Sequence, residues 1–193
     1  TINASVCLRY INHSRARWPS SPRGGVTATK NLDDSARLCH ASPVAALATA
    51  FGSGAMTNSI EELADAGCIL IIGSNTTEQH PVIALRIKEA KRRGAKIIVA
   101  NPRWIELCKF ADVWLRQTPG TDVPLVLALC KVILEEGLLD EEFIGERCEG
   151  FEEFRESLAG VTLEEAAAVT GVEVGLIEDA VRIHASKGPA SNG

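Results

Sequence analysis

Two short aliphatic runs, separated by an amphipathic stretch, dominate the pattern of hydrophobic and polar positions along the chain. Residues 68–72 and 96–100 are almost entirely apolar and too short for a helix of usual length. Such runs are typical of strands that are buried on both faces of a parallel sheet. Residues 81–93 between them carry apolar side chains at helical spacing, begin with a proline and are followed by Gly94, which predicts a helix. The pattern therefore predicts a parallel strand–helix–strand unit.

The same pattern continues toward the C-terminus. Residues 113–115 form a third short apolar run, and residues 123–136 predict an apolar helix that Thr121 or Asp122 can cap. Amphipathic stretches with caps or glycine stops then follow as far as residue 186. The predicted fold class is α/β, with a doubly wound, mainly parallel, Rossmann-like sheet flanked by helices and a helical C-terminal part.

Two further helix starts precede the first strand. Residues 43–51 are small and apolar, which predicts a buried helix capped by Ser42 with Pro43 at its first position. Ser59 and Glu62 have the spacing of a capping box for a short helix.

The first 30 residues have a different composition. Residues 1–30 are rich in Ser, Pro, Arg and Gly and show no usable period, so they are predicted to be irregular. Residues 31–190 are then predicted to form one α/β domain.

Composition excludes several function classes. The net charge of −5 argues against a nucleic-acid partner. Because the chain has neither a signal peptide nor an apolar run approaching the ~20 residues of a membrane-spanning helix, we expect no direct membrane insertion and a cytoplasmic location. The cysteines never occur in CxxC spacing, so a zinc or dithiol site of that kind and a disulfide framework are not expected.

Polar residues follow the first two predicted strands. Residues 74–79 come after the first strand, and residues 101–103 come after the second. In open parallel sheets, ligands bind beyond the carboxyl ends of the strands. The sequence therefore predicts a ligand at this edge, with a nucleotide as the leading candidate.

A second candidate site lies just before residue 43. Cys39 stands beside His40 and close to Arg37, ahead of a predicted helix start. A cation, an imidazole and the positive end of a helix dipole all favour a thiolate, which is a nucleophile and a soft-metal ligand. Local chemistry leaves open the alternative that Cys39 is a buried structural thiol and His40 a surface imidazole.

Four motifs, taken in order, resemble one family. They are Asn-Leu-Asp-Asp-Ser-Ala-Arg-Leu-Cys-His at 31–40, Gly-Ser-Gly-Ala-Met-Thr-Asn at 52–58, Gly-Ser-Asn-Thr-Thr-Glu-Gln-His-Pro at 73–81 and Asn-Pro-Arg at 101–103. Together they resemble the catalytic (alpha) subunit of molybdenum- or tungsten-dependent formate dehydrogenases, within the molybdopterin oxidoreductases. The resemblance runs from about residue 31 to residue 186.

The resemblance implies roles for particular residues. Cys39 would ligate the metal, and His40 would take part in proton handling. One arm of a bis-molybdopterin guanine dinucleotide cofactor would lie against seven residues: Asn75, Glu78, Gln79, Asn101, Arg103, Gly120 and Asp122.

The resemblance also implies a function for a larger protein. The family's iron–sulfur cysteines and its second dinucleotide-binding domain have no counterpart here, so the chain is interpreted as a fragment that is inactive in isolation. The full-length parent would oxidise formate to carbon dioxide and pass electrons to a 4Fe–4S cluster and on to iron–sulfur or NAD-linked subunits. Two alternatives remain: another molybdopterin oxidoreductase of the nitrate reductase type, or a non-catalytic nucleotide-binding scaffold for electron transfer.

Overall fold

The structure is a computed structural model that describes residues 40–56 and 58–186. The described residues belong to two compact units, divided at residue 59, and each unit is considered by itself. Cys39 and the predicted irregular segment 1–30 lie outside the described residues. Within the described part of the chain, no helix has both the length and the apolar character needed to cross a membrane.

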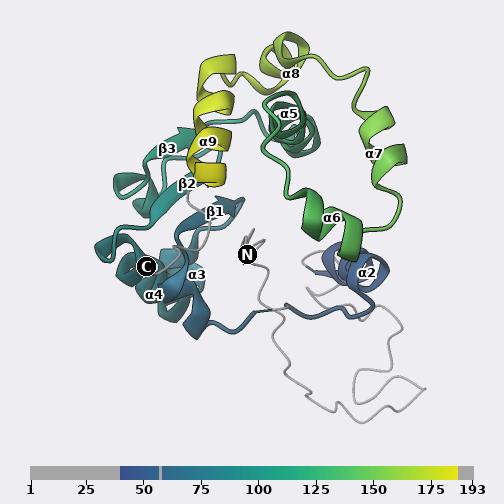
Figure 1. Cartoon of the computed structure of the whole chain (residues 1–193). Helices are drawn as coiled ribbons and strands as arrows, with labels where there is room; N and C mark the ends of the chain where they lie inside the picture. Colours follow the sequence, from purple (N-terminus) through teal and green to yellow (C-terminus); the bar gives the residue numbers. More distant parts are fainter. Residues whose placement is uncertain (1–39, 57, 187–193) are drawn as a thin grey trace, which may run out of the picture. The chain divides into compact units, whose positions relative to one another are not determined.

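The larger unit contains a parallel sheet (Figure 1). Its three strands are β1 (Cys68–Ile72), β2 (Lys96–Ala100) and β3 (Val113–Leu115), in the order β1-β2-β3. Ile72 pairs with Ala100, and Ala100 pairs with Leu115, so the three carboxyl ends lie side by side. All three predicted strands and their parallel arrangement are confirmed.

Helix α4 (Pro81–Arg92) connects β1 to β2 and confirms the predicted crossover helix. Pro81 stands in its first turn, where the backbone N–H that proline lacks would have no acceptor within the helix. Gly94 follows the helix with a φ of 99°, a left-handed conformation that glycine adopts without strain.

Helices cover both faces of the sheet. One core joins alternate strand residues, such as Ile69 and Ile97, to α4 and to the short 3-10 helices η1 (Glu61–Asp65) and η2 (Glu106–Lys109). The opposite core joins Ile98 and Leu115 to three helices: α5 (Asp122–Glu135), α8 (Leu163–Thr170) and α9 (Val174–Ser186). The doubly wound α/β class is therefore confirmed.

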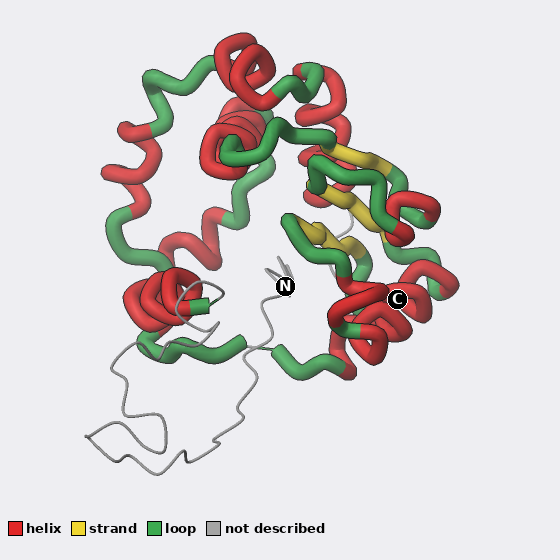
Figure 2. Tube along the Cα trace, turned by 180° about the vertical axis from the view of Figure 1, so that it is seen from behind, coloured by secondary structure: helices red, strands yellow, loops and turns green. Residues whose placement is uncertain are grey.

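The C-terminal part is helical, as predicted. Helices α6 (Glu141–Arg147) and α7 (Phe151–Ser157) lie between α5 and α8 along the chain, and red segments mark them in Figure 2. Arg182 on α9 donates from Nη2 to Glu136 Oε1 at 2.6 Å, which fastens α9 to the end of α5.

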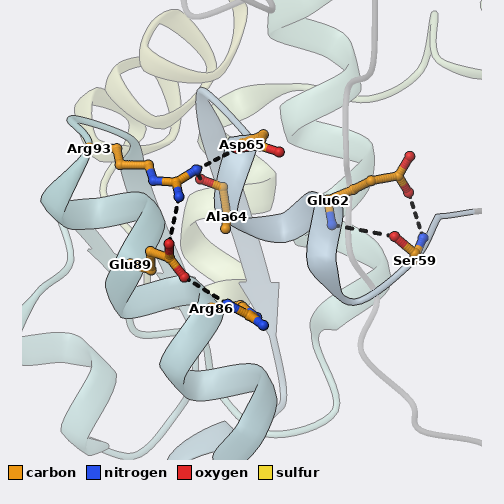
Figure 3. A network of polar contacts seen from close by, with 7 residues as sticks. All are labelled: Ser59, Glu62, Ala64, Asp65, Arg86, Glu89 and Arg93. Carbon is orange, nitrogen blue, oxygen red and sulfur yellow. Dashed lines mark hydrogen bonds and ion pairs between the residues drawn. The ribbon is translucent and has the colours of Figure 1, made fainter.

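A polar network fastens the entry of β1 to the end of α4 (Figure 3). Ser59 N donates to Glu62 Oε2 at 2.6 Å and Glu62 N donates to Ser59 Oγ at 3.4 Å, which confirms the capping box. Arg93 Nη1 donates to Asp65 Oδ1 at 2.5 Å, and its Nη2 donates to Glu89 Oε1 at 2.6 Å. The turn before the sheet is thus held to the helix that covers it.

The smaller unit contains α2 (Ala41–Phe51), and here two predictions are wrong. The helix begins before Ser42, because Val44 N already donates to His40 O at 2.9 Å. Pro43 is tolerated one turn in, since the first four N–H groups of any helix lack an intrahelical acceptor. The predicted burial is also wrong, because none of the helix residues is buried. An apolar helix face gains free energy when another part of the protein buries it, but the composition of the helix does not show that such a surface is present.

Candidate functional site at the carboxyl edge of the sheet

The backbone ladder continues one residue beyond each of the first two strands. Gly73 N donates to Ala100 O at 3.0 Å, and Asn101 N donates to Leu115 O at 3.1 Å. The segments that follow β1, β2 and β3 therefore leave the sheet next to one another. The residues predicted at these three ends are brought to one edge.

The segment after β1 differs from the predicted polar loop. Residues Thr76–Gln79 form a short helix, α3, with Asn75 as its N-cap residue. Ser74 Oγ and Thr76 Oγ1 share a buried hydrogen bond of 2.9 Å, which satisfies these hydroxyls within the chain. Asn75 is buried, whereas Glu78 and Gln79 are exposed and free to meet a ligand.

Asn101 organises the segment after β2. Its Oδ1 accepts from Arg103 N at 2.9 Å, and its backbone oxygen accepts from Trp114 Nε1 at 2.9 Å. Because a backbone N–H can only donate, the acceptor must be Oδ1, which leaves the Nδ2 donors without a protein partner among the described residues. Asn101 is buried, and the Arg103 side chain that follows it is exposed.

The segment after β3 carries Gly120 and Asp122. Gly120 has a φ of 86°, and no atom lies within 4 Å of the Cβ position that another residue would need there. The glycine therefore serves the backbone turn and leaves open space beside it. Asp122 lies in the first turn of α5, exposed, where a carboxylate is stabilised by the helix dipole.

The loop after β3 is anchored by the C-terminal part of the chain. Thr118 N donates to Thr170 O, the last residue of α8, at 2.8 Å. Thr121 Oγ1 donates to Thr118 O at 2.7 Å, so Thr121 closes the loop and does not cap α5 with its side chain. Thr121 is the N-cap residue of α5, as one of the two predicted alternatives has it, but it makes no capping hydrogen bond with its side chain.

Sequence reasoning missed Gln117 at this edge. Its side chain is 2% exposed, and Nε2 donates to Asp122 Oδ1 at 3.0 Å. Gln117 Oε1 is the one buried side-chain oxygen or nitrogen in the described part of the chain that has no hydrogen-bond partner. The signal available in the sequence was an amide side chain within three residues of a strand end, as Asn75 and Asn101 also are.

The distribution of buried polar residues marks the edge as special. Among the residues described, six polar residues are buried, and five of them follow the carboxyl end of a strand: Ser74, Asn75, Thr76, Asn101 and Gln117. Burying polar side chains costs free energy unless they are hydrogen-bonded, so a fold that gathers them at one edge usually uses them there.

The second predicted site is only partly described. His40 is the residue before α2 and is half-buried, while Cys39 is outside the described residues. In the described ranges no three His, Cys, Asp or Glu side chains are grouped as metal ligands. Burial raises the pKa of the Cys68 thiol to about 11, so this strand cysteine is a poor thiolate.

Fold and edge together define the class. A doubly wound parallel sheet with polar side chains gathered at its carboxyl edge is the architecture of α/β domains that bind ligands beyond their strand ends.

The family follows from comparison with known proteins. A model of the molybdopterin oxidoreductase family matches residues 22–184, and the chain belongs to this family. The match begins nine residues before residue 31, where the resemblance of the motifs begins.

Three individual proteins illustrate the relationship. The alpha subunit of F420-dependent formate dehydrogenase 1 from Methanococcus maripaludis is 48% identical over 86% of this chain and 25% of its own. Formate dehydrogenase H from Escherichia coli is 40% identical over 83% of this chain and 22% of its own. The solved structure of acetylene hydratase from Pelobacter acetylenicus superposes with a TM-score of 0.73 at 33% identity, covering 81% of this chain and 21% of the hydratase.

The chain therefore spans about a quarter of the length of the curated relatives that it matches. The resemblance to formate dehydrogenase alpha subunits within the molybdopterin oxidoreductases is confirmed. The site residues predicted from it stay predictions.

Proposed function

We propose that this chain is part of a formate dehydrogenase catalytic subunit and binds one guanine dinucleotide arm of a bis-molybdopterin cofactor at the carboxyl edge of its sheet. The observation that carries the proposal is the gathering of buried polar residues at that edge in the described part of the chain. Relatives named as formate dehydrogenases supply the reaction, which is the oxidation of formate to carbon dioxide.

The donors and acceptors left open at the edge fit such a ligand. The free Nδ2 of Asn101 and the exposed Arg103 guanidinium offer donors for phosphate or carbonyl oxygens. The Asp122 carboxylate accepts one hydrogen bond from Gln117, and the remaining lone pairs of its two oxygens can accept from the ring N–H and the amine of guanine. Asn75, Glu78, Gln79 and Gly120 complete the proposed contact surface.

The chemistry at the metal would depend on two neighbouring residues. When bound, the cofactor supplies molybdenum or tungsten that takes two electrons from the substrate. Cys39 would hold the metal as a thiolate, a soft and strongly donating ligand. His40, placed before α2, would accept or release a proton near neutral pH. Electrons would leave through a 4Fe–4S cluster and partner subunits of the full-length protein, which we place in the cytoplasm.

A second function is considered because the solved structure that resembles this chain is named acetylene hydratase. The same fold thus supports more than one reaction, so the substrate of the full-length protein could be another one, such as nitrate, or the domain could serve as a scaffold. Metal analysis of the full-length protein, followed by assays with formate and with nitrate, separates these functions. If the full-length protein contained no metal, the proposal that it is a molybdenum or tungsten enzyme would be wrong.

The nucleotide site can be tested on the 193-residue chain itself. GDP at millimolar concentration should raise the melting temperature more than ADP does, because the proposed contacts recognise guanine. A ligand at 100 times its Kd adds about 2.7 kcal/mol to the free energy of unfolding. Asp122→Asn should weaken GDP binding about tenfold, since hydrogen bonds to charged groups contribute ~1.5–3 kcal/mol. Equal shifts with GDP and ADP would contradict recognition of the base.

Asp140→Asn is a matched control. Asp140 also stands at a helix start, where its Oδ1 accepts from Phe143 N at 2.9 Å, but it does not follow a strand. Its substitution should leave GDP binding unchanged while lowering stability slightly.

A further inference from the structure

Gln117 occupies an unusual position for an amide side chain. It lies two residues beyond β3 and is 2% exposed, although its amide is polar and glutamine is usually found at the surface. Burying a polar side chain costs free energy unless it is hydrogen-bonded. The hydrogen bonds of the Gln117 amide therefore indicate why this side chain is buried.

The two ends of the Gln117 amide are used unequally. Nε2 donates to Asp122 Oδ1 at 3.0 Å, whereas the buried Oε1 has no partner among the described residues. Since a carboxylate can only accept, the amide nitrogen must face Asp122, and the amide cannot turn over to satisfy its oxygen. An unsatisfied buried acceptor lowers the stability of the fold.

The hydrogen bond from Gln117 to Asp122 is thus formed although the buried Oε1 of the same amide stays unsatisfied, which lowers the stability of the fold. Asp122 is exposed in the first turn of α5, where its side chain could otherwise turn among several rotamers. The bond from the buried amide fixes one carboxylate oxygen, and the other has no hydrogen-bond partner among the described residues. A fixed acceptor binds a ligand better than a mobile one, because less conformational freedom is lost on binding.

We propose that Gln117 is a positioning residue that holds the Asp122 carboxylate in the orientation that accepts the N–H groups of a guanine base. The inference rests on the proposed nucleotide site and adds a specificity-determining residue to it. Gln117 acts through Asp122 and does not touch the ligand.

The decisive variant is Gln117→Met, which keeps the shape of the side chain and removes both polar ends. The substitution removes the unsatisfied Oε1 together with the bond to Asp122, whose exposed carboxylate can be solvated by water instead. The variant should therefore melt at the wild-type temperature or above it. It should nevertheless bind GDP about fivefold to tenfold more weakly, with ADP binding unchanged. A residue with only a structural role would not separate these two readouts.

A double-mutant cycle gives the second test. In an Asp122→Asn background, Gln117→Met should have no further effect on GDP affinity, because the carboxylate that it positions is absent. Thr162→Val is the control, since Thr162 Oγ1 accepts from Glu165 N at 3.3 Å at the start of α8 and makes no hydrogen bond to the loop that carries Asp122. It should lower stability without changing the preference for GDP over ADP.

The outcomes distinguish the two proposals. If Asp122→Asn weakens GDP binding and Gln117→Met leaves it unchanged, the positioning role is wrong and the nucleotide site stands. If Gln117→Met weakens GDP and ADP binding equally, or lowers the melting temperature together with GDP affinity, the positioning role is also wrong. If the wild-type chain binds GDP no better than ADP, both proposals fall.

Discussion

Asp112 and Ile97 exchange two hydrogen bonds at the start of β2 and β3. Ile97 N donates to Asp112 Oδ2 at 2.9 Å, and Asp112 N donates to Ile97 O at 2.7 Å. The same carboxylate accepts from Lys91 Nζ at 2.5 Å and from Lys96 Nζ at 2.8 Å. One side chain therefore fastens β2, β3 and the last turn of α4 at the edge opposite the candidate site.

Asp112 should make the free energy of unfolding depend on pH in the acidic range. Partial burial raises the pKa of the carboxyl, but the hydrogen bonds from Lys91, Lys96 and Ile97 N lower it by more, and the pKa is about 2 against an ordinary 3.8. A folded-state pKa below the unfolded value stabilises the fold above about pH 4, and the contribution is lost as the pH falls toward 2. Asp112→Asn should lower the free energy of unfolding at pH 7 by about 2 kcal/mol.

Urea unfolding of both proteins at pH 7 and at pH 2.5 measures this effect. The difference between wild type and Asp112→Asn should shrink at the lower pH. Glu106→Gln is the control, because Glu106 pairs with Lys88 on an exposed surface, where ion pairs contribute little. A pH-independent difference would show that the Asp112 charge is not responsible.

The capping box makes an asymmetric prediction. The bond from Ser59 N to Glu62 Oε2 is 2.6 Å, whereas the bond from Glu62 N to Ser59 Oγ is 3.4 Å (Figure 3). Glu62→Ala should therefore lower the free energy of unfolding by about 1 kcal/mol, and Ser59→Ala by about half of that. Thermal or urea unfolding of the two variants provides the comparison, and the reverse order would contradict the geometry.

The metal ligand can be identified in the full-length enzyme. On the proposed function, Cys39→Ala should abolish formate oxidation while the cofactor stays largely bound, because alanine offers no donor and the proposed dinucleotide contacts lie elsewhere. His40→Ala should slow turnover about 10²- to 10⁴-fold and change its pH profile with metal content unchanged. Metal analysis and steady-state kinetics measure both effects.

Cys68→Ala is the control for that experiment. Cys68 is buried in β1, and burial raises the pKa of its thiol to about 11. Its substitution should cost about 1 kcal/mol of stability through lost packing and leave turnover unchanged. Wild-type turnover of Cys39→Ala, or a folded but inactive Cys68→Ala protein, would show that the ligand is misassigned.

The strands and α4 could be predicted because their signals are local. Residues 68–72 and 96–100 can be buried on both faces only inside a parallel sheet, and Pro81 and Gly94 mark the two ends of the helix between them. The start of α2 was misplaced because Ser42 and Pro43 fit any of the first helical positions equally well.

The relation between Gln117 and Asp122 could not be predicted. Both residues are polar and near a helix start, and nothing in their spacing indicates that one is buried or that its amide oxygen lacks a partner. That arrangement depends on how α8 and α9 close over β3, which is set by packing between distant segments. In contrast, Asn75 and Asn101 could be placed at the strand ends from the sequence, because the motifs at 73–81 and 101–103 follow β1 and β2 directly.

The bond from Thr118 N to Thr170 O has a consequence for the order in which the protein is made. The ribosome completes β3 and the turn at Gly120 some fifty residues before it adds the acceptor that anchors them. Until α8 has left the exit tunnel, the third segment of the edge lacks this anchor. If the cofactor binds at this edge as proposed, its loading would therefore follow synthesis of the C-terminal helices, and a chain truncated before residue 170 would lack both the anchor and part of the core that covers the sheet.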